Sequence, residues 1–130
     1  MTIAVTPIYA VILTALYLLL SFRVIGRRRT AQVALGDGGD RALLRRQRVH
    51  GNFAEYVPLA LVLMMLAELQ GLPHWALHAI GVILIVGRIA HAYGVSQETE
   101  PMQIRGAAMA LTFTVLIAGA LANVVMLWTR

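Results

Sequence analysis

Four long apolar stretches separated by short polar ones dominate the chain. They cover about residues 4–25, 49–69, 75–95 and 105–128. Each is long enough for a bilayer-spanning helix, which takes about 20 largely apolar residues. Together they use nearly the whole chain, so the pattern predicts an all-α integral membrane four-helix bundle formed by a single domain, residues 1–130.

Turn and helix signals refine this picture. A glycine-rich turn at residues 36–39 interrupts the segment between the first two spans, and from Asp40 the sequence regains helical composition and is expected to run into the second helix. Pro58 lies inside the second span and removes a backbone hydrogen bond, so a kink is expected there. Gly71 and Pro73 are stop signals after that span.

The composition excludes an ordinary soluble domain, because 59% of the residues are hydrophobic and the mean hydropathy is +0.74. No cysteine is present, which excludes disulfides and thiolate ligands, and no metal site is predicted. Any thiol chemistry must come from a substrate. The first span is expected to be retained and not cleaved as a signal peptide, because its basic residues follow the apolar run and no small-residue cleavage site ends it.

The net charge is +5, and all eleven basic residues are arginines. Eight lie between the first and second spans: Arg23, Arg27, Arg28, Arg29, Arg41, Arg45, Arg46 and Arg48. Because they flank spans, they indicate membrane topology and not nucleic-acid binding. The positive-inside rule predicts that the first and third loops are cytoplasmic and that both termini lie outside. Trp75 and Trp128 mark the predicted outer interface.

The second span begins with a polar stripe. Successive helical residues are about 100° apart, so Arg48, Asn52 and Glu55 fall within about 60° of one another. Tyr56 lies on the flank, where it is equally suited to packing with its hydroxyl bonded to a neighbour. Ionisable groups inside a membrane are costly and mark functional sites by default.

Other polar residues converge on the same side of the membrane. Arg88 and His91 share a face in the cytoplasmic half of the third span, Arg105 opens the fourth, and Arg27 and Arg28 close the first. Arginine is in excess in this set. The implied ligand is therefore a small anion with several carboxylates that enters from the cytoplasm.

Each of these residues also has a structural interpretation. Arg48 and Arg105 lie near helix ends, where they can snorkel to the headgroups. Arg88 and Glu55 can form a buried ion pair that only fixes helix packing. His91 can be a satisfied core histidine. The convergence of all of them on one side of the bundle favours a site.

Two motifs resemble those of a known family. Residues 48–58, Arg-Val-His-Gly-Asn-Phe-Ala-Glu-Tyr-Val-Pro, resemble the second-helix signature R-x-x-x-N-x-x-E-[YN]-x-P of the MAPEG family, the membrane-associated proteins in eicosanoid and glutathione metabolism. Residues 87–92, Gly-Arg-Ile-Ala-His-Ala, resemble its third-helix motif, most closely in the prostaglandin E synthase and bacterial branches. The four spans and Arg105 also agree. The resemblance implies a homotrimer in a bacterial inner membrane, with glutathione as co-substrate between adjacent protomers near the cytoplasmic face.

The resemblance also implies roles for individual residues. Glutathione would be bound by Arg48, Asn52, Glu55, Tyr56, Arg88 and His91. Within this set Glu55 would meet the amino group of glutathione. Arg105 would be the catalytic residue that holds the sulfur as thiolate, and Arg27 or Arg28 would lie beside the second substrate. The implied reaction is glutathione transfer to a hydrophobic electrophile dissolved in the lipid phase, or reduction of a lipid hydroperoxide.

One position departs from the family pattern. Seven residues after Arg88, where family members often have tyrosine, this chain has Val95, and Tyr93 lies about 140° from the Arg88 face. The departure disfavours an eicosanoid synthase and leaves open a non-enzymatic structural or accessory membrane subunit. A small proton-coupled exporter that uses Glu55 is a third alternative, which the surrounding arginines disfavour.

Overall fold

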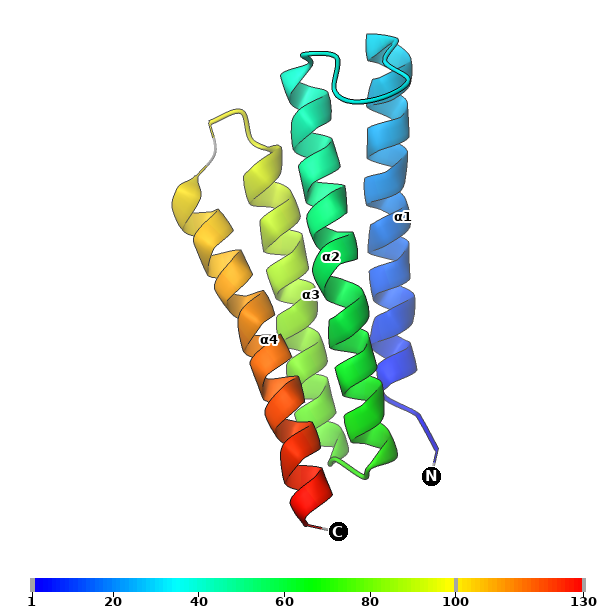
Figure 1. Cartoon of the computed structure of the whole chain (residues 1–130), viewed down its shortest axis with the longest axis vertical. Helices are drawn as coiled ribbons and strands as arrows, with labels where there is room; N and C mark the ends of the chain where they lie inside the picture. The colour runs from blue at the N-terminus through cyan, green and yellow to red at the C-terminus, as the bar shows by residue number, and fades with distance from the viewer. Residues whose placement is uncertain (1, 100, 130) are drawn as a thin grey trace.

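The chain forms an antiparallel bundle of four helices (Figure 1). The structure is a computed structural model that describes residues 2–99 and 101–129, and within them it contains no strand. The helices are α1 Thr6–Ala31, α2 Arg41–Leu69, α3 His74–Ser96 and α4 Met102–Trp128. The α1–α2 and α3–α4 connections lie at one end, called the loop end here, and both termini lie at the other. The predicted all-α four-helix fold is confirmed.

The first two helices extend beyond the predicted spans. α1 continues to Ala31 and not to residue 25, and α2 begins at Arg41 and not at 49. Arginine is a good helix former, so both helices continue past their apolar segments through the basic residues. α1 ends where Gln32 adopts a left-handed conformation with φ of 55°. α2 runs without a break past Pro58.

A narrow apolar core holds the bundle together. Its central members include Leu13, Met64, Leu77 and Leu84, which are almost fully buried. Gly81 permits a close approach of α1 to α3, because a Cβ at this position would lie 2.5 Å from the Tyr9 ring. The remaining helix faces expose many large apolar side chains. All four helices are long and apolar enough to cross a membrane, so the chain is a four-span membrane protein.

A buried carboxylate fastens the terminal end of the bundle. Glu68, on the last turn of α2, is 5% exposed and accepts the backbone N–H groups of Ala4, Val5 and Thr6 at 2.7, 2.6 and 2.8 Å. These amides open α1, whose own N-cap residue Val5 makes no side-chain capping bond. Glu68 therefore caps α1 from a neighbouring helix.

Candidate functional site

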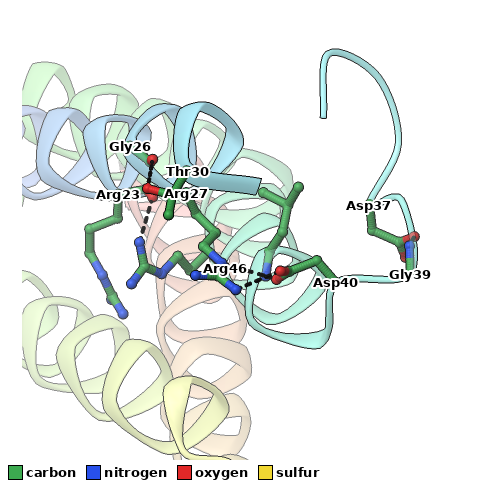
Figure 2. Close-up of polar contacts among 9 residues, drawn as sticks. Arg23, Gly26, Arg27, Thr30, Asp37, Gly39, Asp40 and Arg46 are labelled. Carbon is green, nitrogen blue, oxygen red and sulfur yellow. Dashed lines mark hydrogen bonds and ion pairs between the residues drawn. The ribbon is translucent and has the colours of Figure 1, made fainter. Parts of the chain in front are cut away.

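An ion pair fixes the loop that precedes the predicted site. Arg27 donates from Nε and Nη2 to the two carboxylate oxygens of Asp40, at 3.1 and 2.5 Å (Figure 2). Asp40 also caps α2 by accepting the Leu43 N–H at 2.8 Å. The hydrogen bond from the Arg27 guanidinium, helped by the Leu43 amide, holds the pKa of Asp40 below its usual range. The end of α1 is thereby tied to the start of α2.

Arg28 serves the same loop. Its Nη1 donates to the backbone carbonyls of Val33, Ala34 and Gly36 at 3.4, 3.3 and 2.9 Å. Both arginines that close the first span thus have partners within the protomer. Their predicted position beside a second substrate stays a prediction.

The motifs of the second and third helices meet at Arg88 and Asn52. Arg88 is 2% exposed, and its Nη1 donates to Asn52 Oδ1 at 2.8 Å. A longer contact of 3.4 Å joins the same atom to the Asn52 carbonyl, and Nη2 lies 4.0 Å from Met109 Sδ on α4. Within the described residues Arg88 forms no ion pair. The alternative of a buried Arg88–Glu55 pair is therefore wrong, because the neutral Asn52 amide, one helical turn before Glu55, occupies that place.

The other members of the α2 stripe face away from this contact. Arg48 and Glu55 are exposed on the outside of the protomer, and in the described part of the chain neither has a hydrogen-bonding or ion-pairing partner. Tyr56 is half-buried and packs edge-on against Phe113 of α4, with ring centroids 5.7 Å apart. His91 is buried in α3. The stripe therefore divides into one inward-facing amide and two outward-facing charges.

Arg48 and Arg105 line the same cavity at the loop end. This cavity, called the α2–α4 cavity here, has a volume of about 240 Å³. Its lining residues are Arg41, Leu44, Arg45, Arg48, Val95 and Arg105. Four guanidinium groups line it, and none of its described lining residues carries a carboxylate, so its chemistry suits a small anion.

Val95 lies in the wall of this cavity, and Tyr93 does not. Tyr93 is 60% exposed and lines a different cavity, between α1 and α3. The position of Tyr93 agrees with the helix geometry, which places it away from the Arg88 face.

Two cavity residues, Arg41 and Arg45, were missed by the sequence reasoning. Arg41, Arg45 and Arg48 are spaced i, i+4 and i+7, which places them on one face of an uninterrupted helix. That spacing was the available signal. Arg45 is held by donating to the carbonyls of Val95 and Glu98, each at 3.3 Å. Among the described residues no group of three or more His, Cys, Asp and Glu side chains is placed to hold a metal ion.

The fold and the cavity define a multi-pass membrane protein with an arginine-lined cavity at one end of its bundle. The model of the MAPEG family matches residues 6–125, and the chain belongs to this family. It is also similar to two curated relatives, both named inner membrane protein YecN, from Escherichia coli strains K12 and O6:H1. Each is 38% identical over 119 residues, which are 92% of this chain and 89% of the relative.

Proposed function

We propose that this protein is a glutathione transferase of a bacterial inner membrane, with glutathione peroxidase activity at the same site. The observation that supports this most is the α2–α4 cavity, because it brings Arg48 of the second-helix motif together with Arg105. Glutathione has two carboxylates, one ammonium group and one thiol. The guanidinium groups match the carboxylates and the thiolate, and Glu55 matches the ammonium group.

The geometry of α2 fits a ligand of this length. Arg48 and Glu55 are seven residues apart, which is about 10 Å along the helix. An extended tripeptide spans about the same distance. Both side chains are exposed at the surface of the protomer, and an unpaired charge at an apolar surface is costly in a membrane. A bound ligand and an adjacent protomer would neutralise them, which supports a homotrimer with the site between protomers.

Arg105 would activate the thiol. A free thiol has a pKa near ~8.5 and attacks only as thiolate, and an adjacent arginine lowers that pKa. In transfer to an aryl halide, the sulfur bonds to the ring carbon, the carbon–halogen bond breaks and halide leaves, while the thiol proton goes to solvent. In hydroperoxide reduction, the thiolate sulfur bonds to the terminal oxygen, the O–O bond breaks, and the alkoxide leaves and takes a proton from solvent to become the alcohol. A second glutathione then converts the sulfenic acid to disulfide and water.

A non-enzymatic accessory subunit is the second candidate. Arg88 donates to Asn52 inside the protomer, and Val95 offers no hydroxyl to the cavity. Both facts suit a protein that keeps its polar residues for helix packing. This candidate predicts no activated thiol.

Glutathione titration of the detergent-solubilised protein distinguishes the two candidates. We expect thiolate absorbance at neutral pH and conjugation of an aryl halide. The Arg105→Ala protein should still bind glutathione, because other arginines remain for the carboxylates of glutathione. The pKa of the bound thiol should rise, and each unit of that rise corresponds to a loss of about 1.4 kcal/mol in the stabilisation of the thiolate. Conjugation should collapse at neutral pH and partly recover at high pH.

Arg29→Ala is the matched control, since Arg29 is exposed at the same end of the bundle and lines neither the α2–α4 cavity nor its neighbours. Arg105→Ala protein with wild-type turnover and thiolate absorbance at neutral pH would refute the role of Arg105. Absence of thiolate in the wild-type protein would favour the accessory subunit.

A further inference from the structure

A second basic cavity lies at the loop end, next to the α2–α4 cavity. Its volume is about 410 Å³. Its polar lining residues are Arg23, Arg41, Arg45, Arg46, Ser96, Glu98 and Thr99. It shares Arg41 and Arg45 with the α2–α4 cavity, but neither Arg48 nor Arg105 lines it. We call it the headgroup cavity.

Two of its arginines are held in place by contacts between helices. Arg46 of α2 donates from Nη1 to the Arg23 carbonyl of α1 at 2.9 Å (Figure 2). Arg23 in turn donates from Nη2 to Ser96 Oγ of α3 at 3.2 Å. Neither guanidinium forms an ion pair with a described carboxylate. Among the described lining residues, four arginines stand against the one carboxylate of Glu98, so this part of the lining is strongly positive.

An apolar groove continues from this cavity into the membrane-spanning part of the bundle. The groove lies between α1 and α3, has a volume of about 350 Å³ and shares Arg23 and Ser96 with the headgroup cavity. Leu16 and Leu19 line it from α1, and Ile89 lines it from α3. The two leucines precede Arg23 by seven and four residues, so they lie about 6–10 Å deeper along the helix.

We propose that the headgroup cavity and this groove together bind one anionic glycerophospholipid. The phosphate would lie in the headgroup cavity between Arg23 and Arg46, and an acyl chain would occupy the groove between α1 and α3. Arginine pairs with phosphate through parallel hydrogen bonds, and basic pockets between spans on the cytoplasmic side are typical binding sites of anionic headgroups. The proposal is independent of the glutathione reaction, because it uses neither Arg48 nor Arg105.

The groove is the reason for choosing a lipid over a free anion. A soluble phosphate would use the arginines and leave the apolar groove without a ligand, whereas a phospholipid matches the charge of one part and the apolar character of the other. Tyr93, which lies in the groove wall and is 60% exposed, fits a side chain at the membrane interface. A lipid with no net charge has the same acyl chains but matches the positive lining less well.

Native mass spectrometry of the delipidated full chain in mild detergent tests the proposal. Dioleoyl phosphatidylglycerol should bind at least tenfold more tightly than dioleoyl phosphatidylcholine, and millimolar inorganic phosphate should not displace it. Arg46→Gln should weaken phosphatidylglycerol binding at least tenfold by removing one phosphate contact. Leu19→Trp should weaken it similarly by filling the groove, and because Leu19 is 56% exposed the core stays intact.

Two neighbouring substitutions serve as controls. Arg29→Gln and Leu18→Trp change exposed residues of α1 that line neither cavity nor groove, so both should bind within twofold of wild type. Equal affinity for the two lipids, or wild-type binding by Leu19→Trp, would overturn the proposal, as would full displacement by inorganic phosphate. If Arg46→Gln fails to fold, Leu19→Trp and the lipid comparison still decide. Loss of lipid binding with an intact thiolate signal would separate this site from the glutathione site.

Discussion

The contact between Arg88 and Asn52 predicts a large effect from a small substitution. Asn52→Ala removes the amide oxygen that accepts from Arg88 at 2.8 Å and leaves the guanidinium two longer contacts, 3.4 Å to the backbone carbonyl of residue 52 and 4.0 Å to Met109 Sδ. Hydrogen bonds to charged groups contribute about 1.5–3 kcal/mol, and an unsatisfied buried charge adds to the loss. Because Arg88 is 2% exposed, solvent cannot replace the lost acceptor. We expect the free energy of unfolding to fall by about 2–4 kcal/mol.

Thermal unfolding in detergent, followed by circular dichroism, measures this effect. The melting temperature of Asn52→Ala should drop by about 5–15 °C. Asn52→Asp should retain or raise it, because a carboxylate can pair with Arg88. Thr114→Ala is the control, since Thr114 is exposed and its hydroxyl bonds only to the Ala110 carbonyl of its own helix. A melting temperature of Asn52→Ala equal to that of the control would refute the reasoning.

Two further substitutions test the middle and the C-terminal end of α2. Glu68→Gln replaces one carboxylate oxygen by an NH₂ group, which cannot accept the backbone N–H groups at the start of α1. The free energy of unfolding should therefore fall by about 2–4 kcal/mol. An unchanged midpoint of urea unfolding would contradict this. Glu55→Gln should weaken glutathione binding at least tenfold in calorimetry, corresponding to about 2–5 kcal/mol for a lost charged partner, while native mass spectrometry still shows a trimer. Unchanged affinity would remove Glu55 from the proposed site.

The apolar pattern was sufficient to predict four spans, but it could not predict where the helices end. Hydropathy reports only the part of a helix that lies in lipid. α1 continues six residues beyond its predicted end, through Arg27, Arg28 and Arg29, because helix propensity and backbone hydrogen bonding do not require apolar side chains. The start of α2 was better predicted, since helical composition resumes at Asp40, which caps it.

The sequence predicts which site residues share a face of one helix, but it does not predict which of them contact another helix. Helical spacing places Arg48, Asn52 and Glu55 close together on α2, yet which of them meets α3 depends on how the two helices are rotated against each other. That rotation comes from packing, which places Asn52 against Arg88.

The Glu68 cap escaped prediction for a similar reason. From the sequence, a glutamate at the end of a span is interpreted as a residue of the helix terminus. The antiparallel packing of α1 and α2 brings Glu68 to the backbone N–H groups at the start of α1. The indirect signal was the lack of a capping side chain at the start of α1, since those amides need a partner from somewhere.

The structure separates the charges that the fold uses from those that it does not. Arg27 pairs with Asp40, Arg28 binds loop carbonyls, and Arg88 binds Asn52, so each of the three has a partner inside the protomer. Packing does not account for Arg48 and Glu55, which face outward from an apolar helix and have no partner among the described residues. Charges in membrane-spanning segments are costly and usually pair with a partner or face a polar cavity, so these two residues indicate a partner beyond the packing of the protomer itself. The proposal of a ligand between protomers therefore depends on Arg48 and Glu55 more than on the buried Arg88.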